Sequence, residues 1–240
     1  MIRAALLAAM LNAASVPVAE ASTDCVVLLH GLARTARAMN EMEDALKDDD
    51  YLVANVSYPS REYPIEELAP MAIEEGLEQC GEDAAKVHFV THSLGGILVR
   101  YYYAEHAIDR VGRVVMLAPP NQGSKVADSL GGMPGFDWLH GPAGAQLGKG
   151  EDSIPLSLGA PEFEFAVIAG NRSIDPLSSA ILDNPDDGKV SVEDTKLEGM
   201  SDFRQVEVSH AYIMQNEEVI GLVKRFLRTG TFGELADGAE

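Results

Sequence analysis

The chain is poor in basic residues, in aromatic residues and in cysteine. Lysine and arginine number 18 against 38 aspartates and glutamates, which gives a formal net charge of −20 at pH 7. Binding to a nucleic acid backbone depends on clustered lysine and arginine that release counterions, so this balance argues against nucleic acid as a partner. It also disfavours anionic membranes, and we interpret the acidic residues as a solvated surface.

Long hydrophobic runs are absent beyond the amino terminus. The apolar run 4–11 is too short to span a bilayer and is followed by a small-x-small sequence, A-E-A, that ends at Ala21. This pattern is typical of a secretory signal peptide. We expect residues 1–21 to be cleaved after Ala21, with Ala14 a less favoured site, and residues 22–240 to form one domain without stable membrane insertion. The expected destination is the periplasm or the medium.

The two cysteines predict one disulfide in an exported protein. Cys25 begins the first predicted strand, and Cys80 ends the helix that precedes the third. Both therefore lie at the same edge of the predicted sheet, and we expect a structural Cys25–Cys80 bridge. No C-x-x-C pair is present and no cysteine lies near a histidine, which argues against reactive thiols.

Apolar strand patterns alternate with helical spacing along the chain. The predicted strands cover residues 25–29, 51–58, 87–91, 113–117, 163–169 and 203–208, and the predicted helices cover about 39–46, 65–77, 97–106 and 216–227. This alternation is typical of an α/β fold with a doubly wound, mostly parallel sheet.

The segment 121–161 departs from this alternation. Glycines crowd there around Phe136, Trp138 and Leu139. A long irregular segment inside a compact domain usually serves function, so we expect a Gly-rich lid or cap at 121–161, with a static surface loop as the alternative.

Residues 87–96 read V-H-F-V-T-H-S-L-G-G and place a serine between a strand and a helix. A strand that turns at once into a helix forces its apex residue into a sparsely allowed backbone conformation, so the neighbouring residues must be small. Ser93 is the predicted apex, with clearance from Gly95 and Gly96. Thr91 stands where the G-x-S-x-G pattern has its first glycine. The alternative interpretation is an ordinary turn after a buried strand.

A serine hydroxyl becomes a strong nucleophile only beside a base that an acid orients. His210 directly follows the predicted strand 203–208, and Asp187 lies in the turn P-D-D-G-K-V. Both are expected at carboxyl ends of parallel strands, where ligands bind in open α/β sheets. We therefore expect these two side chains to converge with Ser93 on one crevice.

Three aspartates could orient this histidine: Asp186, Asp187 and Asp194. We favour Asp187, because Gly188 permits the sharp turn that directs a short carboxylate toward His210.

The remaining histidines are assigned other roles. His88 and His92 lie four residues apart without an evident carboxylate companion, so no metal site is expected. We expect His106 to cap a helix or face solvent, and His140 to be a polar residue of the lid.

Attack on an ester carbonyl creates an oxyanion that needs preorganised N–H donors. The backbone N–H of Leu32, after the sequence H-G, and that of Leu94, at the start of a helix, are the candidates. The alternative is that His30 and Gly31 form a simple turn at the end of a strand.

The segments V-V-L-L-H-G-L, V-T-H-S-L-G-G, A-P-P-N-Q-G-S, D-D-G-K-V-S-V and V-S-H resemble the α/β-hydrolase family, particularly bacterial esterases and lipases. The resemblance covers about residues 25–227 and departs from the family pattern at Thr91. It implies Ser93 as nucleophile, Asp187 as acid and His210 as base. Leu32 and Leu94 would be the oxyanion donors. Dinucleotide and phosphate-loop fingerprints are absent, so no cofactor is implied.

These observations predict an exported serine hydrolase that cleaves carboxylic esters of small molecules or lipids through an acyl-enzyme. An acyltransferase or thioesterase with the same triad is the enzymatic alternative. A catalytically silent binding or assembly protein is the other, although such a protein would not need all three residues of the triad. The motifs leave open the acyl chain, the head group and the oligomeric state, and with them the choice between lipase and esterase.

Overall fold

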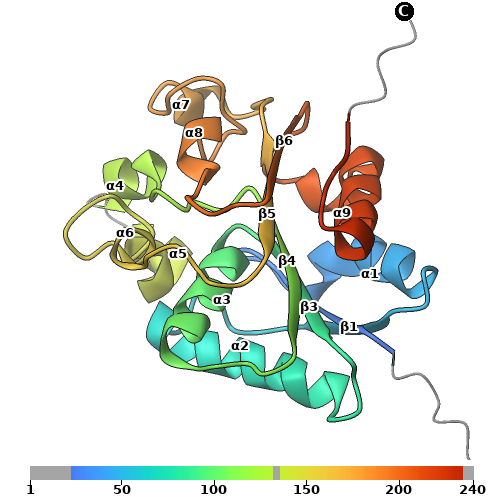
Figure 1. Cartoon of the computed structure of the whole chain (residues 1–240). Helices are drawn as coiled ribbons and strands as arrows, with labels where there is room; N and C mark the ends of the chain where they lie inside the picture. Colours follow the sequence, from blue (N-terminus) through green and yellow to red (C-terminus); the bar gives the residue numbers. More distant parts are fainter. Residues whose placement is uncertain (1–22, 132–135, 235–240) are drawn as a thin grey trace, which may run out of the picture.

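The computed structural model describes residues 23–131 and 136–234, which form one β-sheet with helices on both faces (Figure 1). The predicted signal peptide lies outside the described residues. The strands are β1 (Cys25–Leu29), β2 (Leu52–Val56), β3 (Val87–His92), β4 (Val111–Leu117), β5 (Phe165–Gly170) and β6 (Asp202–Val206). Their order is β2-β1-β3-β4-β5-β6, and all neighbouring pairs are parallel. The predicted doubly wound α/β fold is confirmed.

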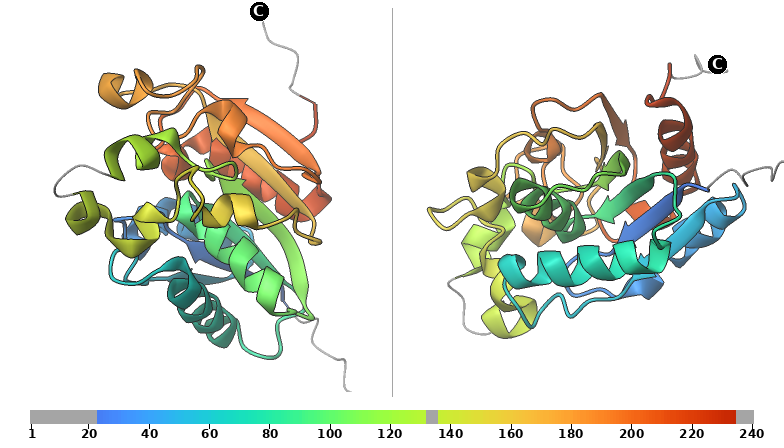
Figure 2. Two further views of the ribbon diagram at one scale, coloured as in Figure 1. Left: turned by 90° about the vertical axis from the view of Figure 1, so that its left-hand side faces the viewer. Right: turned by 60° about the horizontal axis from the view of Figure 1, so that its bottom comes forward.

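The central strands are continuous apolar runs because both of their faces are covered. In β1, Val27 and Leu29 join a core cluster with α2 (Ile65–Cys80) and α3 (Leu94–Glu105). Val26 and Leu28 point to the other face and join a cluster with α1 (Asn40–Lys47) and α9 (Glu217–Thr229). Figure 2 shows these two helical layers on either side of the twisted sheet.

The strand order changes direction between β1 and β3. From β1 the chain passes through the 3₁₀ helix η1 (Ala36–Met39) and α1 to β2, and it then returns through α2 to β3 on the other side of β1. The strands β4 to β6 continue in that second direction. Such a reversal opens a crevice at the carboxyl ends of the two strands, which is where open α/β sheets bind ligands.

The segment 121–161 contains more regular structure than its glycine content predicts. It includes α4 (Lys125–Gly131), α5 (Phe136–Ala145) and α6 (Ile154–Ser157). Gly141 kinks α5 with a φ of 66°, and a Cβ there would lie 1.9 Å from the carbonyl oxygen of Arg61. Glycine at this position thus lets the helix bend where it meets the backbone of Arg61, and the helix continues on both sides of the bend. The predicted lid stays a prediction, since residues 132–135 and the side chains of 130–140, including Trp138, lie outside the described residues.

The remaining short helices are α7 (Pro176–Ser179), α8 (Val192–Thr195) and η2 (Ile213–Gln215). Both α7 and α8 belong to the long connection between β5 and β6.

The expected disulfide is present. Cys25 and Cys80 are bonded, with 5.7 Å between their Cα atoms, and they join the start of β1 to the end of α2. Both residues are buried. The bridge lies at the amino-terminal edge of the sheet, opposite the loops that follow the strands.

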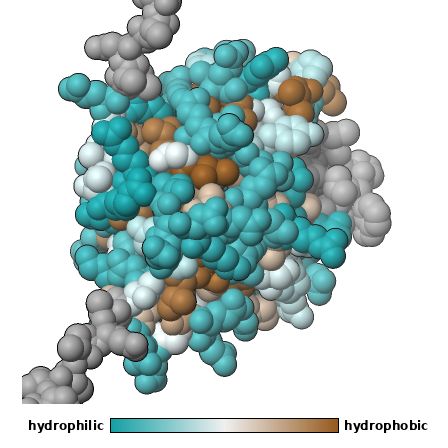
Figure 3. Space-filling model, turned by 90° about the vertical axis from the view of Figure 1, so that its right-hand side faces the viewer, coloured by the Kyte–Doolittle hydropathy of each residue, from teal (hydrophilic) through white to brown (hydrophobic). Residues whose placement is uncertain are grey.

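The face that carries α1 and α9 is mostly hydrophilic, with only small apolar areas (Figure 3). Acidic residues begin both helices, which agrees with the interpretation of the negative charge as a solvated surface. Within residues 23–131 and 136–234, no helix combines the length and the apolar character needed to cross a bilayer.

Candidate active site

Ser93 forms the turn between β3 and α3 in a strained backbone conformation. Its φ of 52° and ψ of −117° fall in a region that non-glycine residues rarely adopt. Its N–H donates to the carbonyl of Leu117 on β4 over 2.9 Å, and its own carbonyl accepts from Gly96 over 3.0 Å. Neighbouring elements therefore hold the serine at the apex that the sequence predicts.

The residues around this apex are small because the chain segments approach closely. A Cβ on Gly95 would lie 2.8 Å from the carbonyl oxygen of Leu29, at the end of β1. A Cβ on Gly96 would meet the Thr91 hydroxyl at 3.2 Å and Pro119 at 3.3 Å. Thr91 fits beside the turn, but its buried hydroxyl has no hydrogen-bond partner in the described part of the chain.

His210 pairs with a buried carboxylate, that of Asp187. The Nδ1 atom of His210 lies 2.7 Å from Oδ2 of Asp187, with the two side chains 12% and 0% exposed. The other carboxylate oxygen accepts from the backbone N–H groups of Lys189 and Val190, at 2.9 and 2.8 Å. Gly188 makes this turn with a φ of 94°, so the carboxylate is fixed in direction by its own loop.

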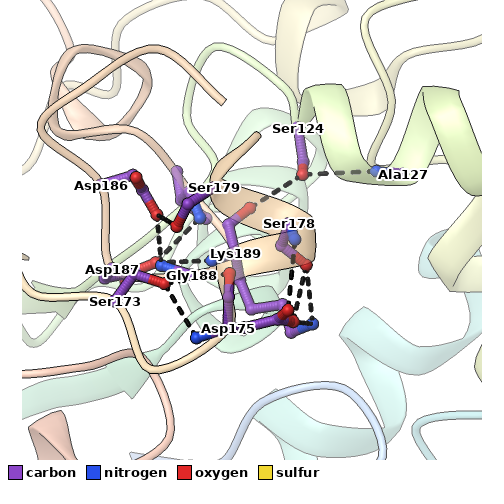
Figure 4. Close-up of polar contacts among 11 residues, drawn as sticks. Ser124, Ala127, Ser173, Asp175, Ser178, Ser179, Asp186, Asp187, Gly188 and Lys189 are labelled. Carbon is purple, nitrogen blue, oxygen red and sulfur yellow. Dashed lines mark hydrogen bonds and ion pairs between the residues drawn. The ribbon is translucent and has the colours of Figure 1, made fainter. Parts of the chain in front are cut away.

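The two other candidate aspartates have different partners. Asp186 accepts from the Ser179 hydroxyl at 2.8 Å and from the Gly188 N–H at 2.7 Å, as Figure 4 shows. Asp194 pairs with Lys149 at 2.5 Å. In the described part of the chain neither carboxylate is hydrogen-bonded to the histidine, so Asp187 is the one that the structure brings to it.

The turn that carries Asp187 and the loop that carries His210 meet at the carboxyl ends of the strands. A Cβ on Gly170, the last residue of β5, would lie 3.0 Å from the Cβ of Asp187. The ring of His210 lies 4.7 Å, centroid to centroid, from the ring of His92, the residue before Ser93. In the described part of the chain no hydrogen bond joins the Ser93 hydroxyl to His210. Catalytic hydrogen bonds are often long before substrate binds.

The turn after β1 lies against the serine. A Cβ on Gly31 would be 3.2 Å from the Cβ of Ser93. Among the described residues, neither the N–H of Leu32 nor that of Leu94 donates to a backbone carbonyl. Both donors are therefore free to bind a ligand oxygen.

Tyr58 holds this turn in place. Its hydroxyl donates to the carbonyl of His30, its N–H donates to Nε2 of His30 over 3.3 Å, and the two rings stack 4.0 Å apart. With Nε2 accepting, Nδ1 carries the proton that is donated to the Gly31 carbonyl over 2.9 Å. Burial lowers the pKa of His30, which keeps the ring neutral.

The other histidines fit their expected roles only in part. His88 does have a carboxylate companion, since its Nε2 lies 3.4 Å from Asp24, 64 residues away in sequence. The expectation of no companion is therefore wrong. In the described ranges, no group of three or more histidine, cysteine or acidic side chains is arranged to hold a metal. His106 caps α3 with its ring on the Tyr102 carbonyl, whereas the side chain of His140 lies outside the described residues.

The arrangement can support nucleophilic chemistry. It combines a serine on a strained turn, a histidine that a buried carboxylate orients, and two unpaired N–H groups beside them. A hydroxyl deprotonated by such a histidine attacks carbonyl carbon, and N–H groups nearby can bind the negative oxygen that results.

Sequence reasoning missed two residues that shape this site, His92 and Tyr58. Their partners are backbone groups of His210 and His30, which lie 118 and 28 residues away. No local pattern marks such a contact.

Comparisons with known proteins agree with the fold. Among solved structures, the mature lipase BlEst2 of Bacillus licheniformis superposes with a TM-score of 0.70 at 19% identity, over 89% of this chain and 96% of that one. A metagenomic carboxyl esterase gives 0.59 at 20% identity, over 84% and 69%. Phospholipase PlaB from Legionella pneumophila gives 0.57 at 19% identity, over 72% and 46%.

A search of curated proteins found no match. The profile of the alpha/beta hydrolase family, in contrast, matches residues 26–213, which is most of the chain. That range includes the strained serine, the buried acid and the histidine, together with all of the parallel strands except Cys25, the first residue of β1. The chain therefore belongs to the α/β-hydrolase family.

Proposed function

We propose that the chain hydrolyses carboxylic esters through an acyl-enzyme on Ser93. Ser93 Oγ attacks the acyl carbon while Nε2 of His210 takes the hydroxyl proton. Asp187 holds the Nδ1 proton and stabilises the imidazolium, and the N–H groups of Leu32 and Leu94 bind the oxyanion. The ester C–O bond then breaks, and His210 returns the proton to the leaving alcohol. Water, deprotonated by His210, then attacks the acyl-enzyme, and the bond from the acyl carbon to Ser93 Oγ breaks. His210 returns the proton to Ser93 Oγ, which releases the acid and the free serine.

One observation carries the proposal: the 2.7 Å contact between His210 and Asp187, beside a serine with a φ of 52°. Backbone strain persists only where the surrounding structure imposes it, and it gathers at functional sites. A silent binding protein would need neither the strained turn nor the oriented histidine. The names of the structural neighbours, a lipase and a carboxyl esterase, support ester substrates.

We also propose export to the periplasm or the medium. The predicted signal peptide and the Cys25–Cys80 disulfide support it, because disulfides persist in oxidising compartments.

Replacement of Ser93 by alanine tests the proposal. If the triad acts as a unit, Ser93→Ala lowers kcat for p-nitrophenyl esters by about five to six orders of magnitude and leaves the oxyanion donors to supply the residual rate. A fluorophosphonate reagent is expected to label the wild-type protein rapidly and the variant not at all. A fall of less than about tenfold, in a variant with unchanged circular dichroism, would contradict the assignment.

A series of p-nitrophenyl esters from acetate to palmitate, with and without an emulsion, separates esterase from lipase activity. Product analysis with added alcohol or thiol separates hydrolysis from acyl transfer. Transfer as the main reaction would replace the hydrolase proposal by its enzymatic alternative.

A further inference from the structure

His92, between Thr91 and the proposed nucleophile, is fully enclosed. It is 1% exposed at the end of β3, and a Cβ on Gly31 would lie 2.7 Å from its Nδ1 atom. Its ring also packs against the ring of His210, with 4.7 Å between the ring centroids. One imidazole therefore contacts both the turn after β1 and the ring of the proposed base.

The hydrogen bonds of His92 determine its tautomer. Its Nε2 lies 3.0 Å from the carbonyl oxygen of His210. A carbonyl only accepts, so Nε2 carries the proton and donates it. The Nδ1 atom is buried and has no partner in the described part of the chain. A second proton on Nδ1 would be a buried donor with nothing to receive it, which is unfavourable.

The surroundings of His92 oppose its protonation. Burial lowers the pKa of His92 far below its ordinary value, and the nearby His210, Arg34 and His30 act in the same direction. The hydrogen bond to the carbonyl of His210 acts in the opposite direction and does not offset them. The ring stays neutral while His210 gains its positive charge during the proposed reaction.

The main chain of His210 is held on both sides of its Cα atom. Its N–H donates to the carbonyl of Asp187 over 3.0 Å, and its carbonyl accepts from His92. The acid thus fixes the ring and the peptide on one side, and His92 fixes the peptide on the other.

We propose that His92 is a positioning residue, whose Nε2–H holds the carbonyl of His210 and whose ring packs against the ring of that base. The inference rests on the proposed function, in which His210 is the base. Displacement of a catalytic group by about 1 Å can cost a factor of about one hundred in rate. Loss of the donor at His92 is therefore expected to affect kcat more than KM.

Two substitutions distinguish the effect of losing the hydrogen-bond donor from the effect of losing the volume of the ring. His92→Leu removes the donor and is expected to lower kcat by about tenfold to one hundredfold, with KM within about twofold of the wild-type value. His92→Gln restores an N–H at a similar reach and is expected to recover most of kcat. Where His92→Leu does not fold, His92→Asn serves, since its amide is too short to reach the carbonyl.

His88 provides a matched control. It lies at the other end of β3, is 2% exposed, and its ring also packs against a glycine, Gly112. His88→Leu is expected to lower thermal stability and leave kcat unchanged below the melting temperature. A kcat for His92→Leu equal to that of His88→Leu would overturn the positioning role.

A spectroscopic measurement makes the test independent of turnover. The Nδ1 proton of His210, bonded to Asp187, is expected to give a downfield ¹H NMR signal that shifts or broadens in His92→Leu and returns in His92→Gln. An unchanged signal in His92→Leu overturns the inference. Absence of ester hydrolysis by the wild-type protein would instead refute the proposed function, and the NMR signal would still decide the role of His92.

Discussion

Two adjacent aspartates of one turn have different partners, which makes the assignment of the acid testable. Asp187 accepts from His210, whereas Asp186 accepts from Ser179 and Gly188. Asp187→Asn places an amide where the carboxylate stabilises the correct tautomer, and we expect kcat to fall by about three to four orders of magnitude with substrate binding nearly unchanged.

Asp186→Asn is the matched control for this substitution. It alters a hydrogen bond within the loop and is expected to reduce kcat far less. Steady-state kinetics on both variants, at matched thermal stability, gives the ranking. A larger loss in Asp186→Asn would assign the acid to Asp186.

The residues of the site differ in how well a sequence can identify them. Asp187 could be selected from the sequence because the feature that marks it is the next residue, Gly188, which takes the positive φ of a sharp turn. Ser93 could be selected because small residues surround it in sequence. His92 could not, because its hydrogen-bond acceptor is a backbone carbonyl that any residue type would present. Only the fold shows that contact.

At the scale of elements, the two glycines in the first turn of α3 make different contacts. The missing Cβ of Gly95 faces backbone carbonyl oxygens of Leu29 and His30 at 2.8 and 3.1 Å, whereas that of Gly96 faces side-chain atoms at 3.2 to 3.5 Å. Backbone cannot move aside without shifting β1 against α3. Gly95→Ala is therefore expected to destabilise the protein by about 1 to 3 kcal/mol, and Gly96→Ala by less.

Urea denaturation measures both free energies of unfolding. Because Gly95→Ala displaces α3 from the end of β1, we also expect it to lower kcat. Equal destabilisation by the two variants would show that the close approach of α3 to β1 is not rigid.

Helices and strands with a regular apolar spacing could be predicted from the sequence. Helices whose position depends on contacts with distant residues could not. The strand predicted at 25–29 and the helix predicted to begin at residue 65 agree with β1 and α2, because continuous or amphipathic apolar spacing fixes which faces are buried. The short helices between 121 and 161 carry no such spacing. One of them bends at Gly141 against the backbone of Arg61, a distant contact that composition does not reveal.

At the scale of the whole molecule, the proposed chemistry and the covalent bridge lie at opposite edges of the sheet. Ser93 and His210 follow the carboxyl ends of β3 and β6, whereas Cys25 begins β1 at the amino-terminal edge. The bridge can therefore affect the stability of the fold without affecting the geometry of the triad.

This separation gives a prediction for reduction of the disulfide. The bridge spans 55 residues, and for a loop of that length the chain-entropy estimate is a stabilisation of about 4 kcal/mol, of which real bridges often deliver less. Reduction, or the double substitution Cys25→Ala/Cys80→Ala, is expected to lower the melting temperature and leave kcat at room temperature unchanged. Calorimetry and ester hydrolysis measure the two quantities on the same sample. Two titratable thiols in protein purified without any reductant would rule out the bridge. A kcat that falls with reduction while the protein stays folded would show that the two edges of the sheet are coupled.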